Sequence, residues 1–349
     1  MRYIGVDHHK KYSYFTVMDE VGRVVKEGKV ENKREEVMRF LDSCRDSGAM
    51  GVIEAGRNWT VMYDWLEEEL DEVKLAHPLK VKAIASAKIK TDRIDSEILA
   101  HLLRSDLIPE SYVPTKEERE VRNVLRQRYF LVRFQTMIKN RIHTILDRHP
   151  EAKGYKEFSD IFGVSGRNYL YSLKLPYPDN YLLKQNLSLL EVVQEKIKSS
   201  EGLLKELTKK DNRVKLLQTV PGIGEYLACL IVYEIGDIKR FGSAKQLCSY
   251  AGIVPGIYAS GNRIYYRGIT HQGNKFLRWA IIESVWPATR TDLGLKILYE
   301  RLKREKGANT AKVAVGRKVL TIIYRILKEG RSYYKKITPA ASYVFRRQG

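Results

Sequence analysis

The sequence predicts a mixed α/β domain at the N-terminus, followed by a mostly helical remainder. Three observations lead to this class. Short strand-like segments alternate with helical periods over the first hundred residues. A basic stretch that contains neither glycine nor proline then runs from residue 115 to residue 149 with a helical period. Beyond residue 210, helical segments are separated by turns that contain glycine or proline.

The first hundred residues contain five strand patterns and three helical patterns. The expected strands are Tyr3 to Asp7, Tyr12 to Met18, Val24 to Val30, Gly51 to Glu54 and Val73 to Ala76. The expected helices are Arg34 to Asp46, Trp59 to Leu70 and Asp95 to Leu103. Three meandering strands followed by alternating helix and strand is the order of the ribonuclease-H-like fold. We therefore expect a domain of this α/β class over residues 1–110.

Residues 111–210 are expected to form a region of long helices. One helix runs from Thr115 to His149, and a second, from Leu187 to Leu207, is placed to pair back on it as a coiled coil. Arginines along the first helix are typical of a rod that follows nucleic acid, and we single out Arg126, Arg133 and Arg141. The stretch from Tyr155 to Asp179 is irregular, and its role is left open.

Residues 211–330 are predicted to form a mainly α-helical domain. The expected helices are Val214 to Leu217, Leu227 to Ile235, Phe241 to Ala251, Asn274 to Pro287, Leu293 to Lys303 and Lys312 to Lys328. A tight turn at Val220 to Gly224 joins the first two, and Pro255 to Arg267 is expected to be a loop or short hairpin. Residues 331–349 form a basic tail that we expect to be disordered until it binds a partner.

The charge balance indicates a polyanionic partner. Charged residues make up 30% of the 349 residues and hydrophobic residues 44%, which is typical of a globular protein, and the formal net charge is +20. A surplus of this size favours nucleic acid. No apolar run is long enough to cross a bilayer, and the N-terminus does not resemble a signal peptide, so we expect no membrane partner and a cytoplasmic location. Cys44, Cys229 and Cys248 lack metal-site spacing and are expected to be free thiols.

Four carboxylates are candidates for a metal site. Asp7 ends the first predicted strand and Glu54 ends the fourth, which is its neighbour in a ribonuclease-H-like sheet. Asp92 and Asp95 lie three residues apart at a helix start and can share one face. Four such charges in a small volume repel one another unless a cation neutralises them. Mg²⁺ (or Mn²⁺), a hard cation that prefers oxygen ligands, is the expected cofactor of a phosphoryl-transfer site built this way.

Each of these residues also has an ordinary structural interpretation. An aspartate after a strand is usually a turn or cap residue. Asp92 would then be a helix N-cap, with Asp95 complementing the helix dipole. His8 and His9 follow Asp7 directly, and we interpret both as structural or surface residues rather than as ligands or bases.

Two sets of motifs resemble those of a known family. The N-terminal set is Ile4 to Lys10 (IGVDHHK), Val52 to Ala55 (VIEA) and Lys90 to Glu97 (KTDRIDSE). The C-terminal set is Thr219 to Gly224 (TVPGIG), Tyr250 to Pro255 (YAGIVP), Ser260 to Asn262 (SGN), Arg267 to Thr270 (RGIT), and Gly273-Asn274 through Leu277-Arg278. In this order they resemble the DEDD transposases of bacterial insertion sequences, which are bridge-RNA-guided recombinases with a RuvC-like N-terminal domain. The resemblance covers nearly the whole chain except the stretch from Tyr155 to Asp179.

The resemblance implies a serine nucleophile in the C-terminal domain, and the matching residue is Ser260. It implies that Ser260 attacks a DNA phosphate to form a phosphoserine link, with metal at the DEDD site of a partner subunit. A serine hydroxyl needs activation, and no His–Asp pair lies beside Ser260 in the sequence. The side chains that could hold the phosphate are Asn262, Arg263, Arg267, Lys275 and Arg278.

The turn from Pro221 to Gly224 resembles a helix-hairpin-helix element. Gly222 and Gly224 permit a tight turn whose backbone N–H groups can face a phosphate. A plain helical connection is an equally good interpretation of the same residues.

The leading hypothesis is therefore an RNA-guided DNA transposase or recombinase. Its expected partners are target and donor DNA, a structured bridge RNA, and further copies of the chain in a homodimer or homotetramer. The alternative is a metal-dependent nuclease of the Holliday-junction or ribonuclease-H type that forms no covalent intermediate. A third class, a nucleic-acid-binding protein without catalysis, fits the net charge equally well.

Overall fold

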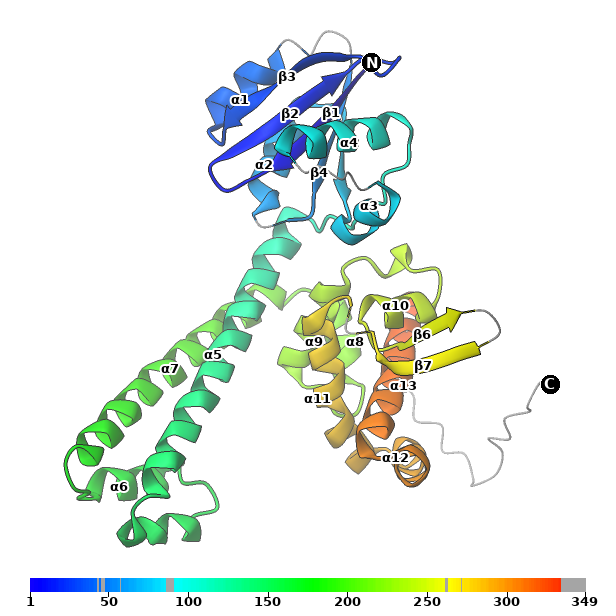
Figure 1. The fold of residues 1–349 in the computed structure, drawn as a ribbon. Coiled ribbons are helices and arrows are strands. Elements are labelled where there is room, and N and C mark those ends of the chain that lie inside the picture. Colours follow the sequence, from blue (N-terminus) through cyan, green and yellow to red (C-terminus); the bar gives the residue numbers. More distant parts are fainter. Residues whose placement is uncertain are drawn as a thin grey trace. The chain divides into compact units, whose positions relative to one another are not determined.

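The chain folds into two compact units, residues Met1–Pro114 and Thr115–Gly349, and each is described by itself (Figure 1). The computed structural model describes residues 1–42, 44, 48–56, 58–85, 91–260, 263–270 and 272–333. Among these, the side chains of residues 151, 153, 257–260, 263, 264, 266 and 267 are not described. The expected boundaries at residues 110, 210 and 330 stay predictions, because the chain contacts separate only the first unit from the rest.

A five-stranded sheet forms the centre of the first unit. Its strands are β1 (Arg2–His8), β2 (Tyr12–Met18), β3 (Val24–Glu31), β4 (Ala49–Glu54) and β5 (Glu72–Ala76), in the spatial order β3-β2-β1-β4-β5. The first three strands are antiparallel neighbours, whereas β4 and β5 run parallel to β1. All five strands predicted from the sequence are confirmed, and the arrangement is consistent with the ribonuclease-H-like class.

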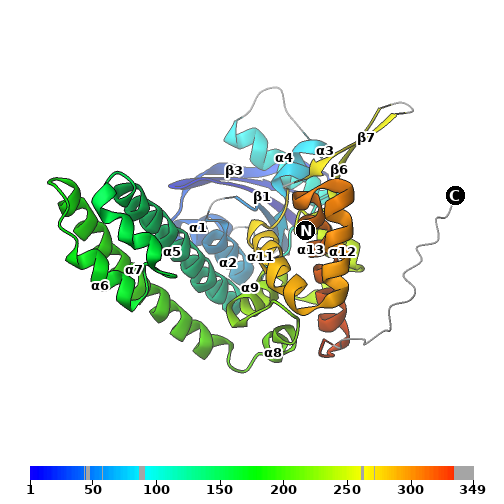
Figure 2. The ribbon, with the colours of Figure 1, turned by 90° about the horizontal axis from the view of Figure 1, so that it is seen from below.

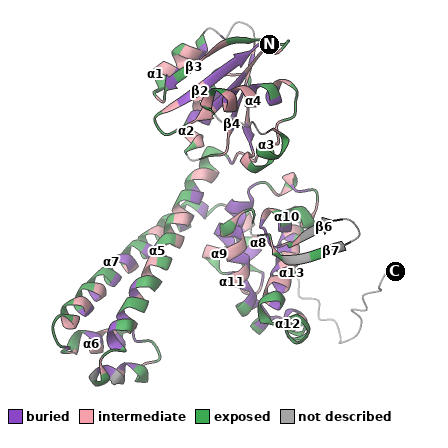
Figure 3. Ribbon diagram, viewed as in Figure 1, coloured by how far each residue is buried: buried purple, intermediate pink, exposed green. Residues whose placement is uncertain are grey.

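Helices cover both faces of this sheet. On one face, α1 (Arg34–Leu41) and α2 (Trp59–Glu69) pack on the alternate residues of β1 that include Ile4 and Val6. On the other face, α3 (Pro78–Ile84) and α4 (Asp92–Arg104) bury a cluster that includes Val52 of β4. The sequence interpretation missed α3, and α4 begins at Asp92 rather than at the predicted Asp95. Figure 3 shows the buried residues concentrated in the central strands.

A contact between α4 and β1 fixes where the helix lies on the sheet. A Cβ atom added to Gly5 would lie 2.0 Å from the backbone oxygen of Ser96 and 2.6 Å from the backbone nitrogen of Ala100. Beside it, the hydroxyls of Thr16 and Ser96 share a buried hydrogen bond of 2.7 Å. Side chains two residues apart on a strand share a face, so Asp7 lies on the same face as Gly5. This crossing therefore holds the N-terminal turn of α4 close to Asp7.

Two long helices form a hairpin at the start of the second unit. They are α5 (Lys116–Leu146) and α7 (Asp179–Thr208), and they lie side by side in both views (Figures 1 and 2). They are antiparallel, because Arg128 of α5 pairs with Glu201 near the end of α7, whereas Arg148, just after the end of α5, pairs with Asp179 at the start of α7. Residues such as Ile142 and Leu187 make up a buried core between them.

The stretch that the sequence left without a role closes the end of this hairpin. The 3₁₀ helix Pro150–Glu157 and α6 (Val164–Ser172) lie between the two long helices in the chain. Tyr155, Phe162 and Leu170 are buried in the same core as the facing residues of α5 and α7. The irregular segment thus supplies the apolar contacts that cover the tip.

The rest of the second unit is a helical body with one β-hairpin. It contains α8 (Asn212–Gln218), α9 (Glu225–Ile235), a 3₁₀ helix (Ile238–Arg240), α10 (Ala244–Tyr250), β6 (Pro255–Ser260), β7 (Arg263–Ile269), α11 (Lys275–Thr291), α12 (Leu293–Lys306) and α13 (Ala308–Glu329). The apolar helix α9 lies in its core. The predicted end of a helix at Pro287 is wrong, since α11 continues through this proline to Thr291. No helix in the described part of the chain has the length and apolar character needed to cross a membrane.

Candidate functional site

Two parallel strands place Asp7 and Glu54 at one edge of the first unit's sheet. Val6 of β1 is paired with Ile53 of β4, so the residues that follow them stand side by side in the register. Both carboxylates lie on the face that α4 covers, because the alternating residues before them belong to that side. The predicted convergence of these two strand ends is confirmed.

The other two predicted carboxylates lie in the first turn of α4. The side chain of Thr91 caps this helix by accepting a hydrogen bond of 3.2 Å from the backbone N–H of Ile94. The interpretation of Asp92 as the N-cap is therefore wrong, because Asp92 is the first helical residue and its carboxylate is not needed as a cap. Asp92 and Asp95 both stand at the positive end of the helix dipole, which favours ionised carboxylates.

A compact cluster of possible ligands forms from Asp7, Asp92 and His9. Their ligand atoms all lie within 4.8 Å of one another. His9 Nε2 is 3.1 Å from Asp7 Oδ2 and also 3.1 Å from Asp92 Oδ1. Asp7 Oδ2 is buried, and among the described residues it has no hydrogen-bond partner besides this contact with His9. In the part of the chain that the structure describes, Glu54 and Asp95 do not join this cluster, although Asp95 is close enough to affect the ionisation of Asp7.

The two aspartates in the cluster have opposite electrostatic character. Burial raises the pKa of Asp7 above its usual value, and the charges of Asp95 and Asp92 add to the rise while His9 opposes it. The pKa of Asp92 is lowered instead, chiefly because Tyr12 donates a 2.9 Å hydrogen bond to its Oδ2 atom. The same bond raises the pKa of Tyr12. Thus its own neighbours hold Asp92 as an anion, whereas burial and the nearby acidic charges outweigh the support that His9 gives to the ionised form of Asp7.

His9 is the site residue that the sequence interpretation assigned to the surface. It begins the turn between β1 and β2, where its backbone N–H donates a 3.0 Å bond to Tyr12 O. Asn32 Nδ2 donates a 2.7 Å bond to the backbone oxygen of His9. These contacts hold an imidazole that is 43% exposed directly beside both carboxylates. The sequence offered one signal that His9 belongs to the site. It follows Asp7 by two residues, in a short turn between two antiparallel strands.

The neighbouring His8 has the structural role that the sequence predicted. Its Nδ1 atom is 2.8 Å from Ser13 Oγ, and Ser13 donates a hydrogen bond of 2.7 Å to Asn32. Burial lowers the pKa of His8. The side chain is thereby engaged in joining β1 to β2 rather than in the cluster.

The donors in this cluster suit a divalent cation. The ligand atoms of Asp7, His9 and Asp92 lie within 4.8 Å of one another, and the buried Oδ2 atom of Asp7 contacts only His9 among the described residues, so a cation would supply a further partner. Oxygen ligands fit Mg²⁺, while an added imidazole is better tolerated by Mn²⁺ and other transition metals. The first unit therefore holds a site that fits the predicted metal, with His9 as an additional donor.

The predicted serine lies at the end of β6 in the second unit. The backbone of Ser260 is paired with that of Arg263 across the β6–β7 hairpin, which confirms the hairpin expected here. Asn262 lies outside the described residues, and the side chains of Ser260, Arg263 and Arg267 are not described. Their roles in catalysis and phosphate binding stay predictions.

The remaining predicted contacts to nucleic acid lie on described helices. Lys275 and the rod residues Arg133 and Arg141 are exposed. Arg278 donates a 3.2 Å hydrogen bond to Ala251 O, and Arg126 forms an ion pair with Glu234. The exposure and the internal bonds of these side chains do not test whether they contact nucleic acid, so these contacts stay predictions.

The predicted hairpin at Gly222 and Gly224 joins α8 to α9. Gly222 has a φ of +82°, and an added Cβ would lie 2.6 Å from backbone atoms of Ser284 and Ala288 in α11. Packing on α11 thus requires glycine here whether or not a phosphate binds. Gly224 is exposed at the N-terminus of α9. Its predicted phosphate contact stays a prediction.

Two separate regions of the chain match models of transposase families. Residues 4–150 match a DEDD transposase domain of the IS110 type. Residues 214–300 match the domain described as "Transposase IS116/IS110/IS902 family". The first match contains the whole acidic cluster, and the second contains the β6–β7 hairpin.

Curated relatives resemble the chain over most of its length. The transposase for insertion sequence element IS1111A of Coxiella burnetii is 28% identical, over 95% of this chain and 91% of the relative. The pilin gene-inverting protein of Moraxella bovis is 27% identical, over 82% of each chain. A probable family 20 transposase of Pseudomonas aeruginosa is 25% identical, over 74% of this chain and 80% of the relative. The chain is therefore similar to transposases of the IS110 and IS116 type in two separate regions, and to a transposase and a pilin gene-inverting protein over most of its length.

Proposed function

We propose that this protein is a DNA transposase or recombinase that cuts and rejoins DNA through a covalent serine–phosphate link, with a divalent-metal site of ribonuclease-H-like architecture assisting. The observation that carries the proposal is the Asp7–His9–Asp92 cluster inside the matched DEDD domain. Relatives named as a transposase and as a pilin gene-inverting protein support DNA rearrangement over simple hydrolysis.

The first unit would hold Mg²⁺ or Mn²⁺ through Asp7 and Asp92, with Glu54 and Asp95 beside them. A bound divalent ion supplies positive charge for a phosphate undergoing substitution. Tyr12 keeps Asp92 ionised by donating to it. Asp7 contributes the buried oxygen that contacts His9.

Ser260 would act as the nucleophile of the second unit. Its hydroxyl oxygen forms a bond to a DNA phosphorus while the bond from that phosphorus to a sugar oxygen breaks. The serine proton goes to a base, and the departing sugar oxygen takes up a proton to become a hydroxyl group. Attack by the sugar hydroxyl of another strand on the serine-linked phosphate reverses these bond changes and rejoins the DNA. The residues proposed to hold the phosphate are Asn262, Arg263, Arg267, Lys275 and Arg278.

A structured guide RNA and further copies of the chain complete the proposal. The net charge of +20 supplies the electrostatic attraction that two nucleic-acid partners need. Exposed arginines on α5, such as Arg133 and Arg141, offer contacts to phosphates that carry no sequence preference. Base pairing with the RNA would then select the DNA target.

Trapping of a covalent adduct tests this function. The full-length protein is expressed together with a plasmid that carries the complete element and its flanking non-coding DNA, and reactions are stopped by rapid denaturation. We expect the wild-type protein to yield a protein–DNA adduct and rejoined DNA, and Ser260→Ala to yield neither. DNA cleavage by Ser260→Ala at the wild-type rate, without an adduct in either protein, would establish the metal-dependent nuclease instead.

A further inference from the structure

The segment that carries Ser260 leaves the helical body and returns to it at one point. It starts after Tyr250, the last residue of α10, and ends at Asn274, which caps α11. The backbone N–H of Asn274 donates a 2.7 Å hydrogen bond to Tyr250 O. Gly252 and Gly273 have positive φ values, and a Cβ on either would lie within 2.4 Å of a backbone oxygen. The two ends of the β6–β7 segment are therefore joined backbone to backbone.

A fully buried glutamate contacts both ends of this segment, one through its carboxylate and the other through its backbone oxygen. Glu234, near the end of α9, is 0% exposed. Its Oε2 atom accepts a 2.7 Å hydrogen bond from Asn274 Nδ2, and its backbone oxygen accepts a 3.2 Å bond from the Tyr250 hydroxyl. Asn274 in turn uses its Oδ1 atom to accept bonds from the backbone N–H groups of Phe276 and Leu277. The asparagine is thus fixed on both sides, by the start of α11 and by Glu234.

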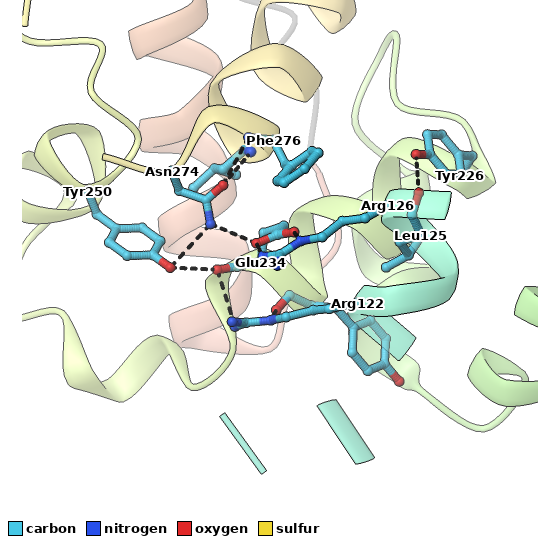
Figure 4. A network of polar contacts seen from close by, with 10 residues as sticks. Arg122, Leu125, Arg126, Tyr226, Glu234, Tyr250, Asn274 and Phe276 are labelled. Atoms are coloured by element: carbon cyan, nitrogen blue, oxygen red, sulfur yellow. Dashed lines mark hydrogen bonds and ion pairs between the residues drawn. The ribbon is translucent and has the colours of Figure 1, made fainter. Parts of the chain in front are cut away.

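The same carboxylate is joined to the long helix α5. Arg126 donates to both of its oxygens, from Nε at 2.8 Å and from Nη2 at 2.9 Å. Figure 4 shows Arg122 and Arg126 reaching from α5 to this network, with Tyr250 and Asn274 on its other side. Arg122 donates a 2.6 Å bond to the backbone oxygen of Tyr233. Arg122 and Arg126 of α5 therefore both bind the end of α9. Tyr250 and Asn274, which form the base of the β6–β7 segment, bind the same end of α9.

We propose that Glu234 is a positioning residue that fixes the base of the 251–273 segment, and with it Ser260, on α5 and α11. A carboxylate that only neutralised Arg126 would not need to accept a bond from Asn274 as well. Because three donors converge on two oxygens, a small displacement of Glu234 moves the attachment of both strand ends. The inference rests on the proposed function of Ser260.

Two conservative substitutions separate the positioning role of Glu234 from a contribution to stability alone. In Glu234→Gln, one acceptor oxygen replaces two, so the side chain cannot accept from both Arg126 nitrogens and Asn274. Asn274→Ser keeps an N-cap hydroxyl for α11 but is too short to reach Glu234. The matched control is Glu201→Gln, which weakens the ion pair between Arg128 of α5 and α7 and leaves the segment untouched.

The experiment measures three quantities for each full-length protein: the thermal midpoint, the affinity for duplex DNA, and the rate of covalent adduct formation well below the midpoint. We expect Glu201→Gln to form the adduct at nearly the wild-type rate. Glu234→Gln and Asn274→Ser should form it at least about tenfold more slowly while binding DNA normally, since a nucleophile displaced by an ångström loses much of its reactivity.

The possible outcomes distinguish a failure of the positioning role of Glu234 from a failure of the proposed serine mechanism. Wild-type adduct formation with unchanged rates in both variants would overturn the positioning role. An adduct rate that follows only the folded fraction of each variant would also overturn it. Absence of any adduct in the wild-type protein would reject the serine mechanism itself.

Discussion

Asp7 lies on a central strand with its carboxylate largely buried beside other acidic residues. Burial and the charges of Asp95 and Asp92 raise its pKa, so the ionised side chain destabilises the folded protein at neutral pH unless a cation is bound. A group whose pKa is raised on folding stabilises the fold when protonated, and this contribution is lost as pH rises through the folded value. In the metal-free protein, the contribution of Asp7 to the stability of the fold is therefore least favourable when its carboxylate is ionised.

Replacement of Asp7 by asparagine tests whether the ionised carboxylate lowers the stability of the metal-free protein while it serves to bind the metal. We expect Asp7→Asn to leave the thermal midpoint of the metal-free protein unchanged or raised by up to about 3 °C. It should also abolish the rise in midpoint that Mg²⁺ or Mn²⁺ produces in the wild-type protein, and EDTA should reverse that rise. Glu35→Gln, on the exposed side of α1, is the control and should respond to metal like the wild type. An undiminished metal response in Asp7→Asn would remove Asp7 from the site.

His9 makes a second prediction at this scale. Because its Nε2 atom lies 3.1 Å from an oxygen of each aspartate, we expect it to act as a ligand. His9→Ala should weaken Mn²⁺ binding about tenfold or more, as measured by titration calorimetry, and should affect Mg²⁺ less. The exposed neighbour Lys10 provides the control variant, Lys10→Ala. Tighter Mn²⁺ binding by His9→Ala would mean that the imidazole competes with the ion instead.

At the scale of elements, the strands of the first unit and the starts of α1 and α2 follow from the sequence, whereas the start of α4 and the whole of α3 do not. The strand patterns contain β-branched and aromatic residues with clear alternation, and these local signals survive folding. The start of α4 depends on Thr91 as its cap, which the apolar period does not reveal. The short helix α3 has a single buried residue, Val81, so it carries little periodic signal. Pro287 was expected to end a helix, but packing of α11 overrides that preference.

The crossing of β1 and α4 gives a prediction for an element. Gly5→Ala places a methyl group against the backbone of α4, so the helix must shift, at a cost of about 3 kcal/mol. The shift moves Asp92 away from Asp7, and the metal-induced rise in thermal midpoint should fall with it. Gly28→Ala on β3 is the control, since its Cβ would make an ordinary 3.6 Å contact with Phe40. Equal stabilities and equal metal responses for the two variants would contradict this account of the crossing.

At the scale of the whole molecule, charge is the property that the sequence states most directly. A net charge of +20 predicts nucleic-acid binding that weakens steeply with salt. Structure refines this, because some arginines are held by carboxylates of the protein itself. Arg126 and Arg128 have such partners, Glu234 and Glu201.

Paired and exposed arginines on α5 should therefore behave differently. We expect the double variant Arg133→Gln/Arg141→Gln to reduce the slope of log affinity for duplex DNA against log salt by about 2. The control Arg128→Gln should leave the slope nearly unchanged. The measurement is fluorescence anisotropy between about 50 and 200 mM salt. Identical slopes for the wild type and the double variant would show that this face of α5 does not contact phosphates.

The sequence by itself determined the order of strands and long helices, the basic surface, and the candidate carboxylates Asp7, Glu54, Asp92 and Asp95. These follow from local periodicity and composition, which act between residues close in the chain. Tertiary structure alone decided that His9 lies between Asp7 and Asp92, and that Glu234 joins both ends of the segment carrying Ser260. Such contacts link residues that are far apart in the chain, as do Arg126 and Glu234, which are 108 positions apart. They depend on how the helices and strands pack, and no local pattern in the sequence tells which distant side chains this packing brings together.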